Sequence, residues 1–319
     1  MAASVGNRAP SHGGETSGGV LSSASDDDGG GFHARLRERP KIERPKSKGI
    51  AMSNGMVTST DGTKIAYERH GSGDPVIVVN TVAEDRSGLS GLAGLLAEHF
   101  TVYSYDRRGR GDSGDTKPYA PEREVEDLAA LVEAAGGGVS LISGSAGCVL
   151  CLDAATALGD SVRGLYLFEP PFIVNDGRPP MPADYVEHLE SLVASGDRSA
   201  AVEYFVTEAL LIPAEFVAGM KADPSWASME RYAHTYAYDG RICAGTQEGK
   251  PLPRDRWRTE APVLVAIGGN SEPSFHDGAR ALADLLPQVS VETLPGQDHG
   301  ALWMAPEAIV ASARRFFTR

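Results

Sequence analysis

The chain has 319 residues, of which 41% are hydrophobic, and a formal net charge of −13. This length fits one large globular domain, and the acidic balance gives no reason to expect nucleic acid or an anionic membrane as a partner. No apolar run reaches the roughly 18 residues that a membrane-spanning helix needs. We therefore expect a cytoplasmic protein whose partner is a small-molecule substrate, and the sequence leaves the oligomeric state open.

Residues 1–55 differ in composition from the rest of the chain. They contain a Gly/Ser-rich run, three aspartates at 26–28 and a basic stretch at 35–48. Such a composition cannot bury a hydrophobic core, and it lacks the apolar segment of a signal peptide. We predict that residues 1–55 are a disordered tail, or that the native protein begins at Met52 or Met56.

After Met56, predicted strands alternate with predicted helices. Short apolar runs predict buried strands, and apolar residues at every third or fourth position predict helices. The predicted strands cover 64–69, 76–79, 102–105, 139–142, 162–168, 263–267 and 289–294. The predicted helices cover 89–96, 121–135, 277–286 and a last segment that ends at Phe317. This alternation predicts an α/β fold with a mostly parallel, doubly wound sheet.

Residues 171–258 interrupt the alternation with a long segment of helical pattern. We expect this insertion to separate two parts of one α/β core, residues 56–170 and residues 259–319. Its aromatic residues favour packing among the inserted helices, and some of them are expected to face an apolar or aromatic substrate. These residues are Tyr185, Tyr204, Phe205, Phe216, Trp226, Tyr232, Tyr236 and Tyr238.

The three cysteines, Cys148, Cys151 and Cys243, cannot form an even set of disulfides. Cys148 and Cys151 have the spacing of a redox or metal motif, but no second Cys/His pair completes a zinc site. Both lie in an apolar run, so we interpret them as small core residues. The sequence predicts neither a metal nor a cofactor.

Ser145 has the sequence surroundings of a catalytic nucleophile. It follows the apolar run 139–142 and stands between the small residues Ser143 and Gly147. A serine on a sharp turn from strand to helix is a nucleophile elbow, in which the hydroxyl is lifted above the sheet and a histidine can take its proton. An ordinary Gly/Ser-rich loop between a strand and a helix is the alternative.

His299 is the candidate base. It lies in Gly296-Gln297-Asp298-His299-Gly300, directly after the predicted strand 289–294. A nucleophilic serine in mid-chain followed by a loop histidine near the end is the chain order of α/β-hydrolases.

Two further runs extend the resemblance to the α/β-hydrolase fold, which covers the chain from about residue 56 to its end. Asp61-Gly62-Thr63-Lys64-Ile65-Ala66-Tyr67-Glu68 is similar to the opening hairpin of that family. The run Tyr105-Asp106-Arg107-Arg108-Gly109-Arg110-Gly111-Asp112-Ser113-Gly114 is similar to its strand-4 exit loop, whose charged residues stabilise the scaffold. The resemblance implies that residues 171–258 form a helical cap over an active site.

The triad acid departs from the family pattern. The resemblance implies an acid after the seventh strand, where this chain has Ser271. Glu272 is adjacent and Asp277 follows shortly after, so both are alternative acids. Glu169 ends the predicted strand 162–168, at the position of the acid in certain haloalkane dehalogenases. We expect Glu169 to be the acid, and the absence of any acid is the remaining alternative.

The oxyanion loop also departs from the family, because Asn80-Thr81-Val82 stands where relatives commonly have His-Gly. By position, the backbone N–H groups of Val82 and Ala146 would hold a developing oxyanion. The resemblance implies a serine hydrolase that cleaves a small apolar ester, lactone or related acyl compound through an acyl-enzyme. The alternatives are a C–C hydrolase, lyase or cyclase of natural-product metabolism, in which His299 is a general base, and a non-catalytic ligand-binding protein.

Overall fold

The computed structural model describes residues 53–319, and the rest of the predicted tail lies outside the described residues. The first strand, β1 (Ser53–Thr58), begins before Met56, so residues 53–55 belong to the sheet and not to a tail. Its polar, glycine-containing sequence does not show the pattern of a strand. The pairing that places it there is antiparallel to the next strand, with Ser53 opposite Arg69.

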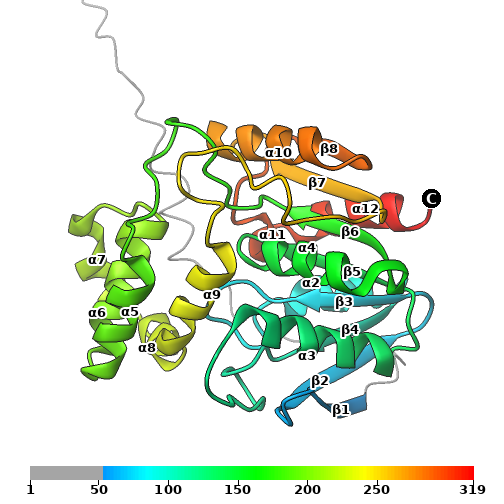
Figure 1. Cartoon of the computed structure of the whole chain (residues 1–319), viewed down its shortest axis with the longest axis horizontal. Coiled ribbons are helices and arrows are strands. Elements are labelled where there is room, and N and C mark those ends of the chain that lie inside the picture. Colours follow the sequence, from blue (N-terminus) through cyan, green and yellow to red (C-terminus); the bar gives the residue numbers. More distant parts are fainter. Residues whose placement is uncertain (1–52) are drawn as a thin grey trace, which may run out of the picture.

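Within residues 53–319, eight strands form one sheet in the order β1-β2-β4-β3-β5-β6-β7-β8 (Figure 1). Strand β2 pairs antiparallel with β1 and β4, and all pairs from β4 to β8 are parallel. The predicted mostly parallel sheet is therefore confirmed. The remaining strands are β2 (Lys64–Gly71), β3 (Pro75–Val79), β4 (Thr101–Tyr105), β5 (Val139–Gly144), β6 (Val162–Phe168), β7 (Val263–Gly268) and β8 (Val289–Leu294).

Helices cover both faces of this sheet, as a doubly wound fold requires. Strand β6 shows how the sequence directs the packing: Leu165 and Leu167 lie in one apolar core, and Tyr166 and Phe168 lie in the other. The first core is covered by α3 (Pro121–Ala134), α4 (Gly147–Leu158) and α10 (Pro273–Leu285). The second is covered by α2 (Ser90–Leu96), α11 (Ala301–Met304) and α12 (Pro306–Phe317). A short 3-10 turn, η1 (Gly159–Ser161), joins α4 to β6.

All three cysteines are buried and free, as expected of small core residues. Cys148 and Cys151 lie on α4 within the first core. Burial raises the pKa of the Cys148 and Cys151 thiols, since it disfavours the thiolate.

The segment between β6 and β7 is a helical insertion, as predicted, with an apolar core of its own. Its helices lie beyond one end of the sheet, and α9 is the one nearest the sheet, where it contacts α3 and α4 (Figure 1). Most of the predicted aromatic residues pack inside the insertion, whereas Phe216 is exposed. The helices are α5 (Tyr185–Ala194), α6 (Arg198–Tyr204), η2 (Phe205–Ala209), α7 (Ala214–Lys221), α8 (Ser225–Arg231), η3 (Ala233–Thr235) and α9 (Tyr236–Cys243). In residues 53–319, no helix combines the length and apolar character needed to cross a membrane.

Candidate active site

Ser145 occupies a sharp turn between β5 and α4. Its φ is 50°, in the left-handed region that non-glycine residues rarely adopt, and such backbone strain costs on the order of 1–3 kcal/mol. Hydrogen bonds hold the turn on both sides: the Ser145 amide donates to the Phe168 carbonyl at 3.0 Å, and its carbonyl accepts from the Cys148 amide at 2.9 Å. Strain that is maintained in this way is characteristic of a functional residue.

The residues around Ser145 must be small because neighbouring segments approach closely. A Cβ added to Gly147 would lie 2.1 Å from Ser143 Oγ and 3.0 Å from the carbonyl oxygen of Asn80. A Cβ added to Gly144 would lie 2.1 Å from Leu302 Cδ1, so Leu302 fills the space beside that glycine. The first turn of α4 therefore lies directly against the loop that follows β3.

Gly147→Ala is expected to destabilise the fold by about 1–3 kcal/mol, because the added methyl group overlaps Ser143 Oγ. In a Ser143→Ala background the same change should cost less, since the overlapping oxygen is absent. Urea unfolding of the four proteins in this double-mutant cycle measures the coupling. Additivity within about 0.5 kcal/mol would contradict the steric explanation.

Glu169 and His299 are brought together beyond the carboxyl ends of β6 and β8, the two strands on either side of β7. Glu169 follows β6 with a φ of 50° and is fully buried. Its Oε2 lies 2.6 Å from His299 Nδ1, and its Oε1 accepts a hydrogen bond from the Gly268 amide at 2.7 Å. With the carboxylate at Nδ1, the proton of a neutral imidazole is held on that nitrogen, and Nε2 is the basic nitrogen.

Neighbouring groups fix the position of the His299 ring. The ring stacks on Phe275, with 4.9 Å between the ring centroids, and Phe168 lies on it at 6.5 Å. The loop that carries His299 is tied to the end of β7, because the Asn270 amide donates to the Gln297 carbonyl at 2.9 Å. Ser145, Glu169 and His299 follow the carboxyl ends of β5, β6 and β8, so all three lie at the same end of the sheet.

The two alternative acids pair with other side chains. Glu272 Oε2 accepts from Arg178 Nη1 at 3.0 Å, and more than half of its side chain is exposed. Asp277 accepts from Asn175 Nδ2 at 2.8 Å and pairs with Arg280. The Asn175 hydrogen bond and the Arg280 charge lower the pKa of Asp277. Of the three predicted acids, Glu169 is the one that the structure places against His299.

The two predicted oxyanion donors lie on the two segments that meet here, the loop after β3 and the start of α4. Val82 lies in the loop after β3, and Ala146 directly precedes α4. Within residues 53–319, neither backbone N–H donates to a backbone carbonyl. Ala83, the next residue of the loop, has a φ of 50°. The conformation of the loop is therefore imposed by its surroundings.

Buried charged residues form a network of ion pairs next to this loop, and only part of it was predictable from the sequence. Arg107, Arg108 and Asp106 were expected to be scaffold residues, and all three are buried in ion pairs. Arg107 Nε and Nη2 donate to the two oxygens of Glu124 at 2.7 and 3.0 Å. Burial acts to lower the pKa of Arg107, but Asp239 and Glu124 raise it well above its usual value. The guanidinium therefore stays charged.

Asp239 of α9 is the residue of this network that sequence reasoning missed. Its Oδ1 accepts from Arg107 Nη1 at 2.7 Å, and its Oδ2 accepts from Arg110 Nη2 at 2.5 Å. The only signal in the sequence is an acid in a short run that is mostly apolar or aromatic, with Tyr238 before it and Ile242 after it. Asp239 connects the insertion to the exit loop of β4.

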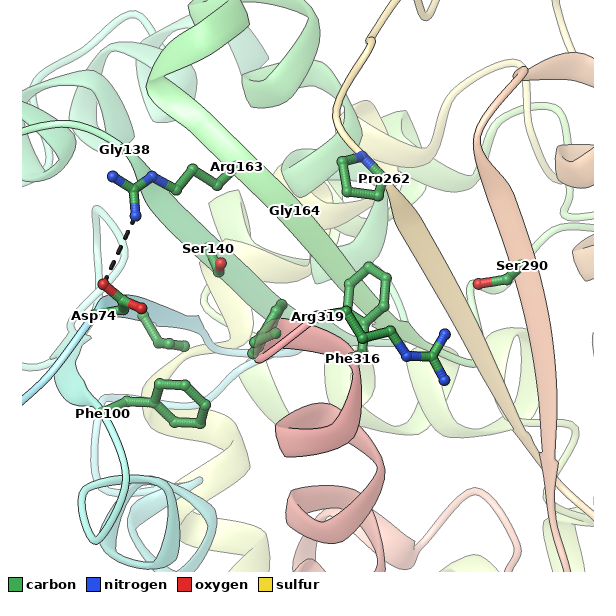
Figure 2. Close-up of a pocket in the computed structure, with 12 residues that line it drawn as sticks. Asp74, Phe100, Gly138, Ser140, Arg163, Gly164, Pro262, Ser290, Phe316 and Arg319 are labelled. Carbon is green, nitrogen blue, oxygen red and sulfur yellow. Dashed lines mark ion pairs between the residues drawn. The ribbon is translucent and has the colours of Figure 1, made fainter.

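A separate hollow of about 460 Å³ lies at the amino-terminal ends of the strands (Figure 2). Arg163 and Asp74 both line it and form an ion pair, with 3.7 Å between Nη1 and Oδ1. Because Ser145, Glu169 and His299 follow the carboxyl ends of strands, this hollow lies at the opposite end of the sheet from them. Within residues 53–319, no cluster of His, Cys, Asp or Glu side chains is arranged to hold a metal ion.

Comparison with known proteins agrees with this architecture. The model of the alpha/beta hydrolase family matches residues 70–313. A solved alpha/beta hydrolase from Sphaerobacter thermophilus is similar with a TM-score of 0.75 and 45% identity, over 82% of this chain and 100% of that chain. A 2-(acetamidomethylene)succinate hydrolase of Mesorhizobium japonicum is 23% identical over 258 residues, 77% of this chain and 88% of that protein.

A non-heme chloroperoxidase of Streptomyces lividans is 24% identical over 275 residues, which are 80% of this chain and 96% of that protein. The match to the family model extends over both parts of the α/β core and the insertion between them. The chain belongs to the alpha/beta hydrolase family.

Proposed function

We propose that the protein is a cofactor-independent serine hydrolase that cleaves a small apolar ester, lactone or related acyl compound through an acyl-enzyme. The observation that carries this proposal is the pairing of Glu169 with His299, at 2.6 Å between Oε2 and Nδ1. Ser145 is the nucleophile, and it stands on a strained turn after β5, at the same end of the sheet as the histidine loop after β8. This is the division of roles of a Ser-His-acid triad.

The reaction begins when Ser145 Oγ attacks the carbonyl carbon and His299 Nε2 takes the hydroxyl proton. The N–H groups of Val82 and Ala146 stabilise the oxyanion. As the tetrahedral intermediate collapses, the bond to the leaving alcohol breaks and His299 returns the proton to that alcohol. Water then attacks the acyl-serine, again with His299 as the base, and releases the acid and free Ser145.

Glu169 suits its role because it is held rigidly. One carboxylate oxygen faces the imidazole and the other is bonded to the Gly268 amide, so the side chain cannot rotate without losing a buried hydrogen bond. A carboxylate fixed at Nδ1 stabilises the imidazolium that forms during each half-reaction. A non-catalytic ligand-binding protein would not need a carboxylate held in this way against a histidine.

The insertion acts in this proposal as a cap over the site. Its apolar core contacts Val82 and Ala83 of the oxyanion loop, which places inserted helices beside the proposed donor. A cap excludes water and supplies an apolar wall for the substrate. Its aromatic content favours an apolar or aromatic acyl compound.

Pre-steady-state hydrolysis of 4-nitrophenyl acetate tests the proposal. We expect a burst of nitrophenol equal to the enzyme concentration, and an acetyl group on the protein by intact mass after a rapid acid quench. Ser145→Ala should abolish both signals. A lyase, a cyclase or a binding protein would produce neither a burst nor an acylated wild-type chain.

A further inference from the structure

The peptide group between Thr81 and Val82 is held on its carbonyl side by two arginines. The Thr81 carbonyl oxygen accepts from Arg107 Nη1 at 3.3 Å and from Arg110 Nη1 at 3.4 Å. These contacts are long for hydrogen bonds, so much of their effect is the attraction of a carbonyl dipole to two buried positive charges. The same planar peptide group carries the Val82 N–H on its opposite side.

Both arginines are anchored by the insertion. Asp239 of α9 bridges them, with 2.7 Å from Oδ1 to Arg107 Nη1 and 2.5 Å from Oδ2 to Arg110 Nη2. Thr235 Oγ1 accepts from Arg110 Nε at 3.2 Å. Both guanidinium side chains are fully buried and the Asp239 side chain is only 5% exposed. The network is shielded from solvent, which strengthens its electrostatic interactions.

The insertion reaches the same loop through apolar contacts. Val82 and Ala83 pack against the apolar core of the insertion, and Val82 also packs against the first core of the sheet. The peptide group that bears the proposed oxyanion donor is therefore held between charges on one side and apolar side chains on the other. Glu124 of α3 is bonded to Arg107, so the carboxylates of Glu124 and Asp239 together balance the charges of the two arginines.

We infer that Asp239 is a positioning residue, through which the insertion sets the orientation of the Val82 amide by way of Arg107 and Arg110. The bridged guanidinium groups fix the plane of the Thr81–Val82 peptide, so its N–H is aimed before the oxyanion forms. The inference rests on the proposed function, because it concerns the oxyanion hole of that reaction.

Comparison of an oxoester with its thionoester tests the inference. Sulfur accepts hydrogen bonds more weakly than oxygen does, so a working oxyanion hole favours the oxoester. We expect Asp239→Asn to lower the ratio of kcat/KM for 4-nitrophenyl acetate to kcat/KM for the matching thionoester by about 10-fold. The loss should appear in kcat rather than in KM, because the donor acts on the transition state.

Asp127→Asn is the matched control. Asp127 is also a buried carboxylate bonded to a buried arginine, Arg108, but neither side chain contacts the oxyanion loop. This variant should lose stability, as Asp239→Asn does, and keep the wild-type ratio. Arg110→Lys is a second test variant, because it keeps the charge and removes the fork that joins Asp239 to the Thr81 carbonyl.

Circular dichroism identifies the folded variants, and the ratio is compared among them. A folded Asp239→Asn or Arg110→Lys protein with the wild-type ratio would overturn the inference while leaving the serine hydrolase intact. A wild-type protein that hydrolyses neither ester would instead overturn the proposed function, and the inference with it. A ratio that falls equally in the Asp127→Asn control would show a general effect of destabilisation and would also overturn the inference.

Discussion

Glu169→Gln is expected to lower kcat for ester hydrolysis by about 10³–10⁴-fold while the protein stays folded. Glutamine has the same shape as glutamate, so packing at this buried position changes little. An amide, however, cannot stabilise the imidazolium of His299, and its NH₂ group can donate to Nδ1 and favour the wrong tautomer. Steady-state kinetics with an ester substrate, together with circular dichroism, measures the effect.

Glu272→Gln and Asp277→Asn are the matched controls for this prediction. Both acids were candidates for the same role, and both pair with arginine side chains instead. Their kcat values should stay within about 2-fold of wild type, because neither charge is placed against His299. Loss of activity in Glu272→Gln combined with an active Glu169→Gln would identify Glu272, which follows β7, as the triad acid.

Arg107→Met is expected to destabilise the fold by about 3–5 kcal/mol, a large share of the stability of a typical domain. Methionine preserves much of the apolar stem, so the main loss is the guanidinium charge. Its removal leaves the buried Glu124 carboxylate without its principal partner and removes one of the two cations at Asp239. Equilibrium urea unfolding, monitored by circular dichroism, gives the free energy of unfolding.

Arg163→Met is the control for Arg107→Met, because it breaks an ion pair at the surface instead of a buried one. The Arg163 side chain is 61% exposed and its partner Asp74 is 76% exposed, with 3.7 Å between the charged atoms. Solvent screens such a pair, so the change should stay within about 0.5 kcal/mol of wild type. An Arg107→Met protein as stable as Arg163→Met would contradict the role assigned to the buried network.

The core elements were predictable from the sequence because their apolar patterns are strong. The strands 162–168 and 289–294 have the predicted bounds, and α3 begins at Pro121, where proline and two following glutamates favour a first turn. The helix α10 begins earlier than predicted, at Pro273, again with proline in the first turn. Strand β1 was missed because its outer edge is exposed and only its pairing with β2 places it in the sheet.

The part of the site that depends on local sequence was predictable, and the part that depends on distant contacts was less so. The elbow at Ser145 is local, since small residues on either side of a serine are visible in the sequence. The pairing of Glu169 with His299 depends on the order of β6, β7 and β8 in the sheet. The sequence favoured Glu169 among several acids by its position, but it could not show the contact with His299. The role of Asp239 could not be predicted from the sequence, because Arg107 and Arg110 meet it only when the insertion folds onto the core.

Labelling with a fluorophosphonate probe, read by intact mass, tests the central claim that Ser145 is an activated nucleophile. We predict one probe per chain on the wild type and none on Ser145→Ala. The control Ser143→Ala, which removes a buried hydroxyl bonded to the Val79 carbonyl, should still be labelled. A folded wild-type protein that remains unlabelled, or a Ser145→Ala protein that is labelled equally, would contradict the claim.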